Sequence, residues 1–254
     1  ACSENLTADN NVGIGHQALY TNGDGSRNTA VGYHALYTMD PASAKSTYNV
    51  AMGFEAGKLI STGELNTIIG AAAGDALTTA SGVVAIGYDA LSTAQGIGNS
   101  VAVGAHAGRL SSQNVTALGY GTLFANTSGQ NNTAVGTQAL YTNVDGDNNT
   151  AVGYQALHKF EADTDGHGGN TGLGYQAGFG ISIGTDNTAI GVNALDADPS
   201  TGNNNTAVGA HALTQATSGA NNTAIGVQAM NTLQTADNNT ALGYGALYTN
   251  VDGD

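Results

Sequence analysis

Histidines and acidic side chains are the groups of this chain that could act as acids, bases or metal ligands. Four of the six histidines, His16, His34, His106 and His211, stand one or two residues after a recurring glycine, so we expect them to point outward at different heights. None has a cysteine or carboxylate at the spacing of a zinc site. The serines fall in turn-like segments and lack the context of a nucleophilic serine. We therefore predict no catalytic residue and no enzyme.

Acidic turns offer the best candidate for a bound ion. The segments Asp145 to Asp147 and Asp163 to Gly166 present hard oxygen ligands in turns, as calcium prefers. No glutamate follows at the position of a bidentate calcium ligand, and aspartate is also a common turn residue. We expect no cofactor and leave calcium open as the alternative.

Tyrosines recur at two fixed places and could form an aromatic strip for carbohydrate or protein contact. The alternative is packing under the turns or between chains. Directly after the recurring glycine stand Tyr33, Tyr88, Tyr120, Tyr154, Tyr175 and Tyr244. Five residues after it stand Tyr20, Tyr37, Tyr141 and Tyr248.

These residues belong to one repeated phrase, of which Asn149 to Leu157 is a typical copy. Most copies are 17 residues apart, and a short, persistent period is typical of a solenoid. The copies are centred on Gly15, Gly32, Gly53, Gly70, Gly87, Gly104, Gly119, Gly136, Gly153, Gly174, Gly191, Gly209, Gly226 and Gly243.

Numbered from that glycine, the residue at −1 is always aliphatic, −2 is nearly always alanine and −3 is threonine or valine. This alternation predicts a strand with one branched and one small face. Alanine at +3 and leucine, methionine or glycine at +4 suggest a second short strand or an extended corner. Asparagine at −4 is interpreted as a structural ladder between stacked coils rather than a binding feature. Its members are Asn28, Asn66, Asn132, Asn149, Asn187, Asn222 and Asn239.

Composition excludes several functions. The net charge of −14 disfavours nucleic acid and anionic membranes as partners. No run of eighteen apolar residues is present, so we expect no membrane insertion. Cys2 is the single cysteine, which rules out an intrachain disulfide and leaves open whether the amino terminus is lipidated.

The spacing pattern also repeats at a longer range. We predict an N-terminal segment (1–10), a first block of seven coils (11–131) and a second block of seven coils (132–254), in one continuous rod. The insertions Met39 to Lys45 and Glu161 to His167 are expected to be loops on one edge. Neither end has a polar terminal coil, so we expect either that the chain is a piece of a longer fibre or that its ends pair with other molecules.

The segment Asn99 to Ala107 resembles the head repeat of trimeric autotransporter adhesins, the YadA-like heads, and Asn149 to Leu157 resembles related repeats of bacteriophage tail fibres and bacterial surface proteins. The resemblance spans the chain, although the coil here is longer than in the adhesins. It implies a left-handed parallel β-roll, three chains side by side, and attachment to cells or surfaces.

We therefore predict an all-β, parallel β-roll or β-solenoid of about fourteen coils. The predicted function is an extracellular structural or adhesive fibre segment that displays loops, with a host-surface protein or glycan as a possible target. Two alternatives remain open: a head-to-tail filament subunit, and a monomeric ligand-binding or ice-binding solenoid. In the first two readings the chain is a homo-oligomer, either a trimer or a filament.

Overall fold

The computed structural model of the chain describes residues 7–94, 98–111, 114–161 and 167–249. Within these residues all regular secondary structure is β-strand, and the strands pair in parallel. The chain divides into two compact units, Ala1–Gly121 and Thr122–Asp254. The all-β, parallel β-solenoid predicted from the repeat is confirmed.

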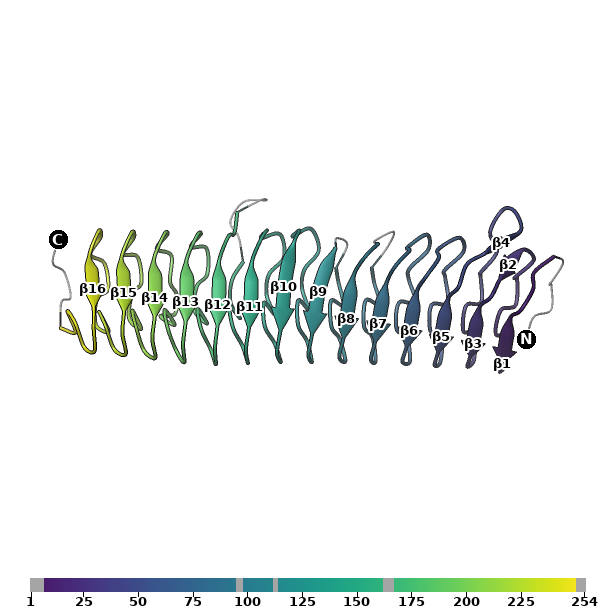
Figure 1. Cartoon of the computed structure of the whole chain (residues 1–254), viewed down its shortest axis with the longest axis horizontal. Coiled ribbons are helices and arrows are strands. Elements are labelled where there is room, and N and C mark those ends of the chain that lie inside the picture. The colour runs from purple at the N-terminus through teal and green to yellow at the C-terminus, as the bar shows by residue number, and fades with distance from the viewer. Residues whose placement is uncertain (1–6, 95–97, 112–113, 162–166, 250–254) are drawn as a thin grey trace. The chain divides into compact units, whose positions relative to one another are not determined.

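Each copy of the repeat contributes one strand, and within each unit these strands follow one another in chain order (Figure 1). In the first unit they are β1 (Val12–Ile14), β3 (Thr29–Val31), β5 (Val50–Met52), β6 (Thr67–Ile69), β7 (Val84–Ile86), β8 (Val101–Val103) and β9 (Val115–Leu118). In the second unit they are β10 (Asn132–Val135), β11 (Thr150–Val152), β12 (Thr171–Leu173), β13 (Thr188–Ile190), β14 (Thr206–Val208), β15 (Thr223–Ile225) and β16 (Thr240–Leu242).

In neighbouring strands, residues from the same column of the repeat lie opposite each other. Thr188 of β13 lies opposite Thr206 of β14. The longer interval between β11 and β12 keeps this register, with Thr150 opposite Thr171. Extra residues are therefore accommodated in the turns, and identical side chains stack from coil to coil.

The pleat of each strand places the small residues at −2 in the interior and the branched residues at −3 and −1 on a partly exposed face. Ala151 and Ala207 at −2 are fully buried, whereas Val152 at −1 is partly exposed. At Gly172, which replaces alanine in the −2 column, an added Cβ would lie 2.9 Å from Cγ of Leu157. The small strand residues thus lie against the turn residues with no space between, as expected for a thin interior.

The recurring glycine ends each strand because no other residue fits there. Gly153 has a φ of +137°, a region that residues with a side chain rarely adopt. A Cβ at this position would also lie 2.2 Å from the carbonyl oxygen of Gly174 in the next coil. Conformation and close backbone approach both require glycine.

The residues after the glycine form tight turns, so the predicted second strand or extended corner is wrong. Gln155 at +2 and Leu157 at +4 have φ values of 52° and 49°. Two left-handed residues so close together reverse the chain, which an extended strand cannot do. Pairing between coils nevertheless continues, since the Leu157 N–H donates to the Ala177 carbonyl at 3.0 Å. The apolar layer we expected here is present, and Ala156 and Leu157 are fully buried.

Left-handed backbone explains which residues the turn columns contain. Position +4 holds leucine, methionine or glycine and never valine, isoleucine or threonine. A branch at Cβ would clash with the backbone at positive φ, whereas leucine branches one carbon later. Leucine at this position thus combines a buried apolar side chain with a left-handed backbone conformation.

The first insertion is better ordered than the loop we predicted for Met39 to Lys45. Met39 is fully buried, and Lys45 begins β4 (Lys45–Ser46), which pairs with β2 (Gly25–Ser26) of the preceding coil. The insertion therefore contributes both an interior side chain and a strand pairing. Most of the second insertion lies outside the described residues.

Candidate interaction surface

The outer side of the strands is the most regular surface of the chain. We call it the strand face and define it as the residues at −3 and −1 of each copy. In the first unit it consists of Val12, Ile14, Thr29, Val31, Val50, Met52, Thr67, Ile69, Val84, Ile86, Val101, Val103, Thr116 and Leu118. In the second unit it consists of Thr133, Val135, Thr150, Val152, Thr171, Leu173, Thr188, Ile190, Thr206, Val208, Thr223, Ile225, Thr240 and Leu242.

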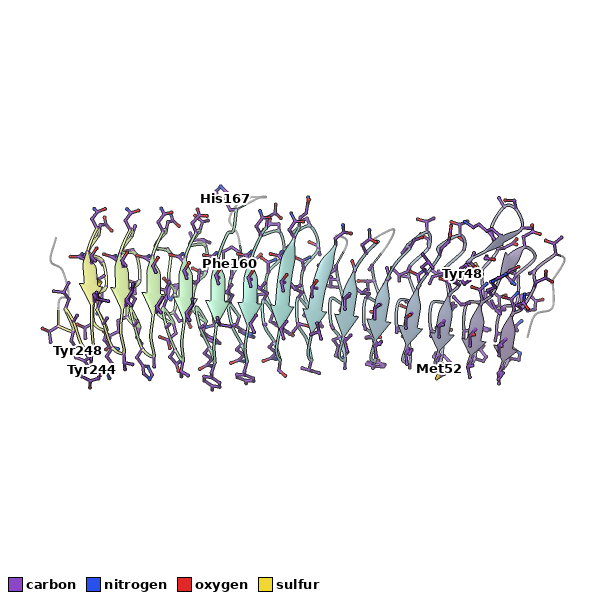
Figure 2. The ribbon with its side chains drawn as sticks, viewed as in Figure 1. Tyr48, Met52, Phe160, His167, Tyr244 and Tyr248 are labelled. Atoms are coloured by element: carbon purple, nitrogen blue, oxygen red, sulfur yellow. The ribbon has the colours of Figure 1, made fainter. Side chains whose placement is uncertain are left out.

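No position of the strand face carries a charge. Its aliphatic side chains reach solvent: Ile14 is 59% exposed, Met52 47% and Leu173 45%. Figure 2 shows Met52 at the end of β5 that leads into the turn. Single exposed apolar residues are ordinary on a protein surface, but a repeated column of partly and fully exposed ones is typical of a surface that contacts another molecule.

The six tyrosines at +1 are all exposed, between 42% for Tyr33 and 81% for Tyr244. Two of them, Tyr33 and Tyr154, stack on a ring of the next coil. Tyr33 lies between His16 and Phe54, with ring centroids 5.2 Å and 5.3 Å away and nearly parallel planes. Because neighbouring rings cover both of its faces, Tyr33 can meet a ligand only through its edge and hydroxyl group.

The predicted strip is divided into short clusters rather than continuous. Tyr154 and Tyr175 stack on each other, whereas Tyr88 and Tyr120 meet His106 edge to face. Alanine, threonine and valine occupy the +1 position of most intervening coils, which interrupts the column. Tyr244 projects from the turn after β16 (Figure 2).

A longer aromatic stack lies at +5 in the second unit. Tyr141 lies 5.0 Å from Phe124 and 5.4 Å from His158, and His158 lies 5.3 Å from Phe179, all with nearly parallel rings. Of these four residues, only Tyr141 was predicted as part of this column. Aligning the copies would have found them, because aromatic rings of three residue types share this one column.

The asparagines at −4 have the same partners in coil after coil. The backbone N–H of Asn149 donates to Oδ1 of Asn132 at 2.9 Å, and Oδ1 of Asn149 accepts the N–H of Asn170 at 2.9 Å. Nδ2 of Asn132 donates to the carbonyl of Gly146 in a turn at 2.7 Å. Asn28, Asn66, Asn132, Asn149, Asn187 and Asn222 are buried, and Asn239 is partly exposed. Buried asparagines thus form hydrogen bonds with backbone groups that have no partner within the strands.

A charged cluster in the first unit escaped sequence analysis. Lys58 donates to Glu55 at 2.9 Å, and this hydrogen bond raises the pKa of the lysine above its usual value. Burial raises the pKa of the Asp75 carboxyl, as do the negative charges of Asp89 and Glu55. Lys58 also attracts Asp75, but burial and the two carboxylates outweigh it. Aligning the copies places Glu55 at +2 and Lys58 and Asp75 at +5, but the contacts between these columns depend on the turn geometry.

His34 and His106 are less outward than we expected, whereas His16 and His211 are exposed, as expected. Only 16% of the His34 side chain is exposed, because Nε2 donates to Oε1 of Gln17 at 2.7 Å and Nδ1 lies 3.6 Å from Glu55. Side chains of neighbouring coils pair along this column, which draws the imidazole against the surface. His106 lies similarly, 3.5 Å from Asp89.

The acidic turns give no assembled ion site where the structure describes them. Asp147 accepts the backbone N–H of Gln130 at 2.6 Å, so its carboxylate binds a neighbouring turn. The described residues contain no group of three histidine, cysteine or acidic side chains placed to share an ion. The segment Asp163 to Gly166 lies outside the described residues. Calcium therefore remains an expectation, with no structural site among the residues that are described.

One open hollow lies in the second unit, beside the second insertion. His167, labelled in Figure 2, and Asp186 are the titratable residues of its lining. Asn148, Gly168, Gly169 and Thr185 complete the lining. Backbone and small polar groups dominate, and the hollow does not assemble an acid–base pair with a nucleophile.

The described part of the chain has no helix long and apolar enough to cross a bilayer. Comparisons with protein-family models, with curated proteins and with solved structures give no match.

Proposed function

We propose that the chain is a structural segment of an extracellular attachment fibre, in which copies of the chain associate side by side through the strand face. The observation that supports this proposal is the uncharged, partly exposed row of threonine and aliphatic side chains that runs along both units. Antiparallel sheets often leave a polar face in water, but parallel sheets are normally covered on both faces. Here the turns cover one face, and a partner would cover the other.

A second copy of the chain is the partner that fits this face best. Its strand face carries the same columns at the same spacing of about 4.8 Å between coils, so the rows of two copies can match within each unit. Copies arranged around a three-fold axis would each bury this face in a closed assembly. The resemblance to adhesin heads favours the same trimer.

The proposed attachment function depends on what stays outside such an assembly. The first insertion and the turns extend from the coils, and the exposed tyrosines at +1 add ring edges and hydroxyl groups. These groups suit contact with a host-surface protein or a glycan. The chain would act by presenting them on a stiff scaffold, without a chemical reaction.

Light scattering after gel filtration tests the association. We expect the molar mass of three chains for the wild type and of one chain for Val152→Lys, since a charge on the strand face would have to be buried. Gln234→Lys, at an exposed turn position away from this face, is the matched control and should keep the wild-type mass. A wild type that stays a single chain at every concentration would overturn the proposal.

A second candidate is a monomeric solenoid that binds ice, and one observation favours it. In the second unit every −3 position is threonine, whereas the first unit has valine at four of these positions, Val12, Val50, Val84 and Val101. Regular hydroxyl and methyl groups on a flat sheet suit a periodic solid surface. A monomer that lowers the temperature of ice growth, and loses this effect in Thr188→Lys, would establish this candidate; no effect of the wild type would discard it.

A further inference from the structure

We infer that Tyr154 and Tyr175 form a site of oxidative modification, at which a one-electron oxidant joins the two phenol rings of one chain as dityrosine. This inference does not depend on the proposed attachment function, because it concerns two residues of a single chain.

The two rings are already held together by the fold. Their centroids lie 5.3 Å apart and their planes differ by 13°. Both side chains leave the same column, two residues after β11 and β12, whose strands pair with Thr150 opposite Thr171. The backbone therefore holds the two Cα atoms near the strand spacing of about 4.8 Å, within reach of a bond between the rings.

Both phenols are open to an oxidant. Tyr154 is 44% exposed and Tyr175 is 50% exposed. Exposed side chains change rotamer within picoseconds to nanoseconds, so the rings can tilt from the stack until their ortho carbons touch. Fixed backbones and free side chains together favour coupling within the pair over coupling with a second molecule.

Two other stacked tyrosines lack a phenol partner. Tyr33 stacks on His16 and Phe54, and Tyr141 stacks on Phe124 and His158. A further pair of phenols, Tyr20 and Tyr37, stacks at 5.3 Å in the first unit, but both side chains are more buried than those of the exposed pair.

The reaction balances with hydrogen peroxide as the oxidant and a peroxidase as the catalyst. Each phenol gives up one electron and one proton and becomes a phenoxyl radical. The two radicals form a carbon–carbon bond between their ortho carbons, and the ortho hydrogens then move to the oxygens to restore both phenols. One peroxide takes up the two electrons and two protons and leaves as two waters, so the chain loses two hydrogen atoms.

The bond would connect two coils on either side of the second insertion. A covalent link across such a loop restricts the unfolded chain and opposes local separation of the coils. In an oxidising environment the pair would therefore act as a chemical staple for this part of the second unit.

The test treats the dilute full-length chain with peroxidase and limiting hydrogen peroxide and measures intact mass and tryptic peptides. Trypsin cleaves after Lys159, which lies between the two tyrosines, and no lysine or arginine follows it. We expect a single-chain product that has lost two hydrogen atoms and links peptide 110–159 to peptide 160–254. The yield of this product should not change on dilution.

Matched variants assign the bond. Tyr175→Phe keeps the ring stack and should lower the yield of the linked peptides about tenfold or more, because the effective concentration of the second phenol is lost. Tyr88→Phe removes an equally exposed tyrosine that meets His106 instead of a phenol, and it should leave the yield unchanged. An undiminished yield in Tyr175→Phe, or products that link only separate chains, would overturn the inference.

Discussion

Oδ1 of Asn132 accepts two hydrogen bonds from Asn149, one from its backbone N–H at 2.9 Å and one from its side-chain Nδ2 at 3.1 Å. The same acceptor position recurs between other coils, for example from Asn222 to Asn205. At the start of most strands, a buried asparagine amide thus replaces the backbone partner that the turn cannot supply. This arrangement makes the asparagine column part of the framework rather than a binding surface.

Replacement of Asn149 by alanine should destabilise the second unit. It leaves the N–H of Asn170 without its partner inside the fold and removes one of the two hydrogen bonds to Oδ1 of Asn132. We expect a loss of about 2–4 kcal/mol in the free energy of unfolding, measured by urea denaturation. Asn148→Gly is the control, since Asn148 is exposed and has a φ of 57° that glycine adopts freely. Equal losses in both variants would contradict a structural role for the column.

Substitution at the strand-ending glycine should be more damaging still. Gly153→Ala places a Cβ 2.2 Å from the carbonyl oxygen of Gly174 and at an unsuitable φ. We expect a loss of about 3 kcal/mol or more, or failure to fold. In Gly245→Ala the φ is +59° and no atom lies within 4 Å of the new Cβ, so the loss should stay near 1 kcal/mol. Circular dichroism during thermal unfolding compares the two, and similar midpoints would refute the close approach.

The turn column provides a test with side chains of equal size. Leu157 is buried at a φ of 49°, and Met230 occupies the same column at 48°. Leu157→Met should cost less than about 1.5 kcal/mol, as volume-conserving exchanges do. Leu157→Ile keeps the volume but branches at Cβ, and it should cost about 1–3 kcal/mol more because of backbone strain. If isoleucine were tolerated as well as methionine in urea denaturation, strain would not explain the column.

The pH dependence of stability should depend on Asp75. Burial, Asp89 and Glu55 raise the pKa of this carboxyl above its unfolded value, so the ionised form destabilises the fold. This destabilisation is present at neutral pH and disappears as the pH falls below the ordinary aspartate range. Asp75→Asn should therefore stabilise the first unit at pH 7 by a few tenths of a kcal/mol, since solvent screens a half-exposed group. The difference should vanish near pH 3, below the usual aspartate pKa of about 3.9. A constant difference at both pH values in urea denaturation would contradict the assignment.

The strands, their burial and their register were all predictable from the repeat. Thr150, Ala151 and Val152 alternate as a strand must, and a fixed period places like residues opposite each other. The turns were not predictable from the same reasoning. Leu157 is not a typical turn residue, although it has a positive φ. The only sign of this conformation in the sequence is that β-branched residues are absent from its column.

The gaps in the tyrosine column can be read from the aligned copies, but the ring contacts within it cannot. Whether Tyr154 meets a phenol, an imidazole or an alanine depends on the neighbouring coil, and thus on the register of the turns. Likewise, Asp75 and Asp89 come together only because the +5 position of one coil lies beside the +2 position of the next. Contacts of this kind need the turn geometry, which the periodicity of the strands does not contain.

The central claim is that the strand face is the contact between copies of the chain. Its most direct test is the dipolar coupling between spin labels, with Cys2 replaced by alanine and a single label at Thr188→Cys on the strand face. We expect strong coupling between labels of different copies that falls when labelled chains are mixed with an excess of unlabelled chains. A label at Gln234→Cys, on an exposed turn, should couple weakly. No coupling at position 188, or stronger coupling at position 234, would contradict the claim.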